Sequence, residues 1–390
     1  MTELSYTGII SPRTSNKVEN QWGCGQSVFA LVSGKGTGFM TFYQELQLNQ
    51  AGSKAVIKNA SGFGEKFRHS AVYLFKILIT LLFCMAFVIA YSTIFGNDNS
   101  IAGVVVLLCI MVFRFADLGI RVPHAMGAIG VMFAVLAFGP RIANAGNAVF
   151  GLMTNVICIF LLMVLGCHNV MMANQSTLVL GYLLLYGYDV TGQAYWMRLA
   201  AIGTGAVLTG IVYYRNHRRQ TYKRDLKSLI QEFDIHSSRT RWQLTVTLGV
   251  SSVLFFAALM HLPRAMWAGI AAMSVLLPFR QNIKERVKGR IPGNILGGAA
   301  FLLLYMILPP SYYTLIGILG GIGVGLSASY QWQAVFNSLG AMAVAVGILG
   351  LPGAVFYRIL NNAFGALYGQ VFEKLMCRSV DRLTGRQCLE

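Results

Sequence analysis

Twelve stretches of the sequence are apolar and long enough to cross a lipid bilayer as helices. The hydrocarbon layer is about 30 Å thick, and a helix needs about 20 apolar residues to span it. The composition agrees, because 55% of the 390 residues are hydrophobic and only 12% are charged, roughly half the charged fraction of a soluble chain. The sequence therefore predicts an all-α polytopic membrane protein with about 12 transmembrane helices. The expected spans are residues 73–96, 101–117, 123–139, 147–166, 176–188, 195–214, 242–260, 265–280, 292–308, 312–328, 331–349 and 353–374.

Two segments of the first half return in altered form in the second half. IRVPHAMGAIGVMFAVLAFGP, which begins at Ile120, matches GRIPGNILGGAAFLLLYMILPP, which begins at Gly289. YWMRLAAIGTGAVLTG from Tyr195 matches FYRILNNAFGALYGQ from Phe356, and both contain the pattern Arg-x6-Gly-Ala. The chain is therefore expected to consist of two six-helix repeats. Because each repeat has an even number of spans, its first and last residues lie on the same side of the membrane. The two repeats are therefore expected to be parallel and related by an axis along the membrane normal.

The repeats divide the chain into five expected regions. These are an N-terminal cytoplasmic segment (1–71), a first repeat (72–214), a basic cytoplasmic linker (215–241), a second repeat (242–376) and a cytoplasmic tail (377–390). Apolar residues recur with helical spacing in the linker at Leu226, Leu229, Ile230 and Phe233. This spacing predicts an amphipathic helix that lies on the inner leaflet. In the N-terminal segment, SGKGTG lacks the residue spacing of a phosphate-binding loop.

The lysine and arginine residues predict the orientation of the chain. Of the 31 Lys and Arg residues, 26 fall in residues 1–71, 114–121, 215–241 and 280–290 and from Lys374 onward. The expected outer loops carry only Arg141 and Arg264. The positive-inside rule then places both termini in the cytoplasm. The net charge of +17 is dispersed over these inner loops, so nucleic acid is not an expected partner.

An arginine lies inside the last expected span of each repeat, as Arg198 and Arg358. An arginine at a helix centre costs about 2.5 to 3.5 kcal/mol on insertion scales, so its presence in both copies favours contact with a substrate or a pore. Both arginines also lie close to the outer ends of their spans, so structural arginines that reach to the headgroups are the alternative. The neighbouring Trp196 and Tyr357 could hold an aromatic ring or belong to an interfacial aromatic belt.

The cytoplasmic turn that opens the third span of each repeat ends in a similar way. Arg121 and Arg290 each precede a Val-Pro or Ile-Pro pair and a glycine-rich helix start. Free N–H groups beside an arginine favour an anion, although an ordinary basic rim of an inner loop explains the same residues. Asp117 and Glu285 are expected to form ion pairs with these arginines, and His124 is expected to be structural.

Motifs for catalysis are absent from the sequence. It contains no Gly-x-Ser-x-Gly, HExxH or paired-carboxylate pattern, so the protein is not expected to be an enzyme. The seven cysteines show neither CxxC nor Cys/His spacing, and no metal ion or cofactor is expected. Acidic residues in or beside the spans are few and lie near the ends, so no buried carboxylate relay for sodium or proton coupling is visible.

The basic turn that ends RIPGNILGG and the Arg-x6-Gly-Ala element resemble the FUSC superfamily of fusaric acid resistance proteins and aromatic acid exporters. Each half is also similar to the membrane unit of the plant aluminium-activated malate transporters, in which a six-helix unit pairs in a dimer. The resemblance covers roughly residues 70 to 376. It implies that Arg198 and Arg358 line an anion path and that Arg121 and Arg290 lie at its cytoplasmic mouth. The chain lacks the large cytoplasmic domain that the larger exporters carry between their halves.

The expected function is the export of organic anions, such as aromatic or other carboxylic acids, across the inner membrane of a bacterium. The expected partners are a small organic anion and the lipid bilayer. The expected assembly is a homo-oligomer or a monomeric pseudo-dimer. Two alternatives stay open: a passive anion channel that resembles the malate channels, and a membrane scaffold or envelope-assembly subunit that does not transport.

Overall fold

The computed structural model describes residues 41–384, apart from 49, 173, 223, 236 and 279–282. SGKGTG, at residues 33–38, lies outside the described part of the chain. The secondary structure of the described residues is helical, without a strand. The chain divides into two compact units, Met1–Leu82 and Phe83–Glu390, which are described separately.

The described part of the first unit contains α2 (Phe42–Gln47), α3 (Gln50–Asn59) and the first turns of α4 (Phe63–Phe95). Thr41 begins α2 with a capping box in which it exchanges hydrogen bonds with Gln44. The buried side chain of Glu45 on α2 contacts His69 on α4, with 2.7 Å between Oε1 and Nδ1. This contact fixes α2 against α4 within the unit.

The second unit holds the remaining described helices, most of which are long and apolar. Every expected span overlaps a helix, and seven helices of the described chain are long and apolar enough to cross a membrane. The predicted all-α polytopic fold is therefore confirmed, while the count of twelve spans stays a prediction. The helices are α5 (Ser100–Phe113), α6 (Val122–Ala145), α7 (Ala148–Gly166), α8 (Gln175–Gly187), α9 (Gln193–His217), α10 (Leu226–Gln231), α11 (Ser238–Leu259), α12 (Met266–Val275), α13 (Ile283–Ile307), α14 (Tyr313–Leu326) and α15 (Tyr330–Thr384).

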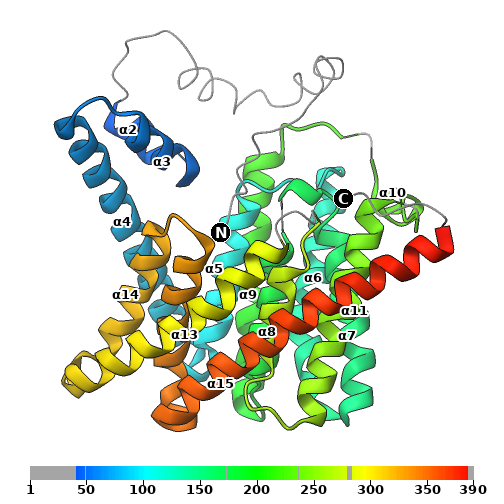
Figure 1. Cartoon of the computed structure of the whole chain (residues 1–390). Helices are drawn as coiled ribbons and strands as arrows, with labels where there is room; N and C mark the ends of the chain where they lie inside the picture. The colour runs from blue at the N-terminus through cyan, green and yellow to red at the C-terminus, as the bar shows by residue number, and fades with distance from the viewer. Residues whose placement is uncertain are drawn as a thin grey trace. The chain divides into compact units, whose positions relative to one another are not determined.

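The helices of the second unit pack in two groups that share an interface. The main core lies between α5, α6, α7, α8, α9 and α11. A second group is formed by α12, α13 and α14, all of which pack against α15 (Figure 1). The two groups meet where α11 contacts α12 and α15 and where α8 contacts α12.

One break in α15 separates the two last expected spans. Gly350 has φ 69° and ψ 168°, and Pro352 follows two residues later. A positive φ is favourable only for glycine, and a proline cannot donate a backbone hydrogen bond to the preceding turn. The helix therefore changes direction between residues 331–349 and 353–374, as the two separate apolar runs predict.

The linker helix α10 packs on the main core through Leu229, which is only 3% exposed, and its expected position on the inner leaflet stays a prediction. One local expectation needs correction. Pro292 does not mark a helix start, because α13 already begins at Ile283. A proline inside a membrane helix is tolerated when neighbouring groups donate hydrogen bonds to the backbone carbonyl that it leaves without a partner.

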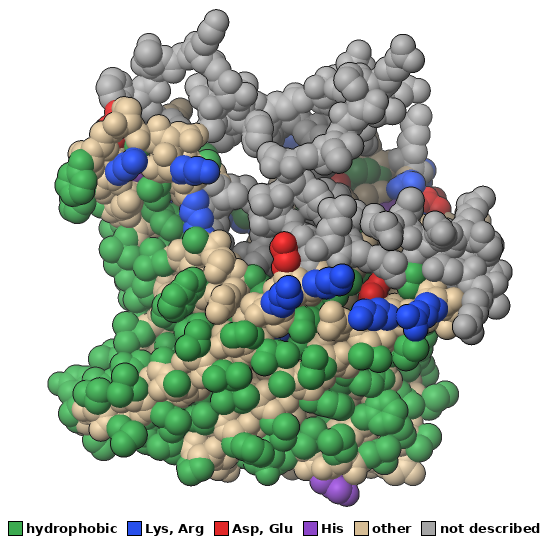
Figure 2. All heavy atoms as spheres, in the orientation of Figure 1, with side chains coloured by type: hydrophobic (Ala, Val, Ile, Leu, Met, Phe, Trp, Pro, Cys, Tyr) green, Lys and Arg blue, Asp and Glu red, His purple; other side chains and the backbone are tan. Residues whose placement is uncertain are grey.

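The outer face over α13 and α15 is broadly apolar, and Lys and Arg side chains gather along one border of it (Figure 2). Large apolar side chains that are exposed on these two helices include Leu303 and Met306 on α13 and Phe356 on α15. A continuous apolar surface of this kind indicates contact with lipid acyl chains.

Small residues allow α13 and α15 to approach closely. A Cβ on Gly297 would lie 2.6 Å from the carbonyl oxygen of Val335 and 2.8 Å from Cβ of Ser338. Close backbone approach through small residues is the usual way in which membrane helices associate. Gly130 on α6 is a matched comparison, because a Cβ there would meet no atom within 4 Å.

We predict that Gly297→Val destabilises the protein by about 1–3 kcal/mol, because the added side chain must push α15 away. Gly130→Val should leave stability close to wild type. Thermal unfolding of both variants in detergent, followed by tryptophan fluorescence, measures the difference. Equal melting temperatures for the two variants would show that α13 and α15 do not pack in this way.

A polar cluster attaches the linker to the loop after α7. Nε2 of His168 lies 3.2 Å from Nη1 of both Arg224 and Arg239. Glu232 also contacts both arginines, at 2.9 Å and 3.4 Å, and its Oε2 lies 3.4 Å from the imidazole. Burial first, and then the Arg239 guanidinium, lower the pKa of His168 to about 4. The imidazole is therefore neutral at physiological pH and accepts hydrogen bonds from the arginines.

We predict that this cluster makes stability depend on pH. Because the pKa of His168 is lower in the folded state than the ordinary value of 6.5, its stabilising contribution is full above pH 6.5 and decreases as the pH falls toward 4. From pH 7.5 to pH 5, wild type should lose more thermal stability than His168→Asn. His261→Asn, at an exposed histidine, is the control and should follow wild type. An equal loss in wild type and His168→Asn would contradict the prediction.

Candidate functional site

A cavity of about 460 Å³ lies where helices of the two groups meet. Its walls come from α5 and α8 on one side and from α12, α13 and α15 on the other. The first wall is apolar, with Ile101, Val104, Leu180 and Leu184. The opposite wall also contains apolar residues, and it carries the polar groups Arg290, Asn294, Tyr330, Asn337 and Arg358. An apolar pocket with a few convergent polar groups is the usual form of a small-molecule site.

Arg290 on α13 is held in the cavity wall by neutral partners. Its side chain is buried, and Nε donates a hydrogen bond to Oδ1 of Asn362 at 3.1 Å. Nη1 donates to Oγ of Ser274 at 2.8 Å and to the hydroxyl of Tyr330 at 2.7 Å. Tyr330 in turn donates to Oγ of Ser274 at 3.1 Å. These bonds orient the guanidinium without neutralising its charge.

Arg358 on α15 is the second buried cation in the wall of the cavity. Its side chain is 6% exposed, and its guanidinium carbon lies 5.2 Å from the centre of the Trp267 ring. Its Nε is buried and has no hydrogen-bond partner. Within the described chain, no carboxylate lies within 4.0 Å of either Arg358 or Arg290.

The electrostatic consequence is a cavity with uncompensated positive charge. A buried charge is ordinarily paired, because its transfer from water into a low-dielectric interior is costly. Here two guanidinium groups share one cavity with hydroxyl, amide and aromatic partners only. A bound anion would supply the missing compensation, since a guanidinium offers a carboxylate two parallel donors.

Arg198, the expected counterpart of Arg358 in the first repeat, has a different environment. Its Nε donates to Oδ1 of Asn99 at 3.0 Å and its Nη2 to the carbonyl of Asp98 at 2.9 Å. Its Nη1 donates to the carbonyl of Tyr188. The side chain is buried and does not line the cavity. Arg198 therefore joins the start of α5 to the end of α8.

Arg121 likewise differs from its counterpart Arg290. It lies at the N-cap of α6, where its exposed side chain approaches Oδ1 of Asp225 in the linker at 3.1 Å. Of the six residues expected to contact a substrate, the structure brings only Arg290 and Arg358 to the cavity. Trp196 is 69% exposed, and Tyr357 packs beside Trp267 behind the cavity wall.

The expected acidic partners do not pair with arginines. Asp117 accepts hydrogen bonds from the backbone N–H of Gly119 and from the hydroxyl of Tyr222. Neither Asp117 nor Glu285 forms an ion pair within the described chain. Nδ1 of His124 accepts the N–H of Leu226 at 3.1 Å, which fits the structural role expected for it.

Sequence reasoning missed the groups that surround the two cavity arginines. Trp267, Tyr330 and Ser274 gave no signal, because each lies on a different helix from the arginine that it contacts and acts only through tertiary contacts. The sequence does place two amides, Asn337 and Asn362, inside apolar spans. An amide in a membrane span is costly enough to suggest a polar partner nearby.

Comparison with known proteins identifies part of the chain. Residues 251–372 match the family model described as fusaric acid resistance protein-like. Neither a curated protein nor a solved structure matches the chain. The matched segment runs from α11 into α15 and includes both cavity arginines. The resemblance of this chain to the FUSC superfamily is therefore confirmed through residues 251–372.

Proposed function

We propose that the protein is a transporter that moves organic anions across a membrane through the cavity at Arg290 and Arg358. The observation that carries the proposal is the pair of buried guanidinium groups without a carboxylate partner in a cavity between membrane helices. The match to fusaric acid resistance protein-like sequences supports the same conclusion. Export from the bacterial cytoplasm across the inner membrane, with both termini inside, is the direction proposed from this likeness and from the charge distribution.

The cavity favours a carboxylate that carries an apolar body. Arg290 is already oriented by Ser274, Tyr330 and Asn362, so little side-chain entropy is lost when it binds a carboxylate. Arg358 has a free Nε and can exchange part of its contact with Trp267 for an anion. The apolar wall of α5 and α8 suits the ring or alkyl part of an organic acid.

One chain supplies both walls of the cavity, which supports a monomeric pseudo-dimer as the functional unit. Homo-oligomers can still form through the exposed apolar faces without changing the path. Transport also requires that the anion leave again. Because the partners of Arg290 are neutral, its guanidinium can return to them after the anion leaves, and Arg358 can return to the ring of Trp267.

We predict that Arg358→Gln and Arg290→Gln each lower the transport of labelled benzoate in proteoliposomes by at least about tenfold, because a hydrogen bond to a charged group contributes about 1.5–3 kcal/mol. Arg358→Lys should retain part of the activity, since lysine keeps the positive charge but lacks the two parallel donors of a guanidinium. Arg215→Gln, at an exposed position, is the control. Wild-type rates in both glutamine variants would contradict the proposal and favour the scaffold alternative.

We predict a different defect for Arg198→Gln. Removing three hydrogen bonds to Asn99, Asp98 and Tyr188 should lower the folded yield and the melting temperature, because the buried Asn99 amide and two part-buried carbonyls lose their donor. The folded fraction should still transport. The readout is size-exclusion chromatography together with transport per folded molecule, and a folded but inactive Arg198→Gln would place this arginine in the path.

A passive anion channel is the second candidate, and one observation favours it. None of the described residues that line the cavity is Asp or Glu, so a carboxylate for proton or sodium coupling is not visible there. Planar-bilayer recordings separate the two candidates. Discrete openings that each pass many ions indicate a channel, whereas slow and saturable flux without openings indicates a carrier.

A further inference from the structure

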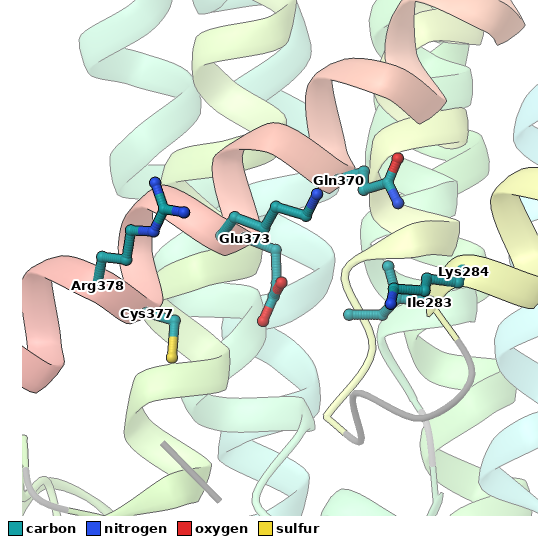
Figure 3. Close-up of a pocket in the computed structure, with 7 residues that line it drawn as sticks. Ile283, Lys284, Gln370, Glu373, Cys377 and Arg378 are labelled. Carbon is teal, nitrogen blue, oxygen red and sulfur yellow. The ribbon is translucent and has the colours of Figure 1, made fainter. Parts of the chain in front are cut away.

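A second pocket, of about 360 Å³, lies between the start of α13 and the end of α15. Figure 3 shows Gln370, Glu373 and Arg378 along α15 on one side and Ile283 and Lys284 at the start of α13 on the other. Both helices are candidate membrane spans, and the pocket lies at the terminal turns of these spans. The pocket is separate from the arginine cavity, with which it shares no residue.

The pocket carries an excess of positive charge. Lys284, Lys374 and Arg378 line it and are solvent-exposed, and Glu373 is the one acidic residue among the described residues of its lining. None of the three cations forms an ion pair within the described chain. Three mobile donors around a cleft of this size suit a phosphate group, which offers several acceptor oxygens.

An apolar stripe on α15 leads directly to this pocket. Leu367, Val371 and Leu375 are 50%, 55% and 54% exposed, and their spacing of four places them on one helix face. Arg378 continues the same face one turn further. The basic pocket and the exposed apolar stripe are therefore adjacent, as the headgroup and the acyl chain of a lipid are.

We propose that this pocket binds the headgroup phosphate of an anionic phospholipid, whose acyl chain lies along Leu367, Val371 and Leu375. Free phosphate would use only the cations and would leave the stripe unexplained. Lysine and arginine at the end of a span contact headgroups while their aliphatic stems remain on apolar surface. The bound lipid covers the junction of α13 and α15, the two helices that carry the cavity arginines.

Native mass spectrometry of the full chain in mixed micelles tests this assignment. Wild type is titrated with phosphatidylglycerol and with phosphatidylcholine of the same acyl chains, and separately with phosphatidylglycerol in the presence of millimolar inorganic phosphate. The variant is the triple change Lys284→Gln, Lys374→Gln and Arg378→Gln. The matched control removes three exposed cations elsewhere, by Arg215→Gln, Arg218→Gln and Arg219→Gln.

Wild type should bind one phosphatidylglycerol at least about tenfold more tightly than phosphatidylcholine, because lysine and arginine near the membrane surface attract anionic lipid. The pocket variant should lose this preference, and the control should keep it. Lack of headgroup preference in wild type, or an equal loss in variant and control, overturns the proposal. Displacement of the lipid by inorganic phosphate would assign the pocket to a free anion instead.

Discussion

The burial of guanidinium groups away from water is the constraint on which the structure depends. The three arginines that are buried in the described part of the chain meet this constraint in different ways. Arg198 gives its hydrogen bonds to Asn99 and two backbone carbonyls and thereby joins α5 to α8. Arg290 is held by an amide and two hydroxyls, and Arg358 by the face of Trp267. Arg290 and Arg358 line the same cavity, and no carboxylate of the described chain is in contact with either, which supports the proposal that the cavity binds a diffusible anion.

Close packing of α12, α13 and α15 places the two arginines in the cavity wall. A Cβ on Gly365 would lie 2.1 Å from the carbonyl oxygen of Ala268, so the part of α15 that carries Arg358 lies directly against α12, which carries Trp267. Gly293 likewise allows α13 to approach the first part of α15, with 2.7 Å between its added Cβ and the carbonyl of Gln331. The break at Gly350 lets the two parts of α15 contribute to one cavity from different directions, as Tyr330 and Arg358. Small residues thus set distances that larger side chains would prevent.

Much of the fold could be predicted because an apolar run of membrane length has almost no alternative to a helix. Arg290 and Arg358 could be found from the sequence, since each stands in a pattern that occurs twice. The contrast between Arg198 and Arg358 could not be predicted from the sequence. The partners of Arg198 come from η3 (Asn97–Asn99) and the end of α8, and only the folded structure brings them to the arginine. Tyr330 and Trp267 were also beyond sequence reasoning, since aromatic residues in a membrane protein usually only pack or mark an interface. The inward turn of Leu229 depends on a core surface that the linker sequence does not reveal.

Locating a bound anion tests most directly whether Arg290 and Arg358 form an anion-binding site. Crystals of the protein grown with 4-bromobenzoate, measured at the bromine absorption edge, show where the acid binds. If Arg290 and Arg358 bind the anion, the bromine lies in the cavity, with the carboxylate in contact with both arginines and the ring toward α5 and α8. Binding confined to another part of the protein, or full occupancy of the cavity after both arginines are changed to glutamine, would contradict it.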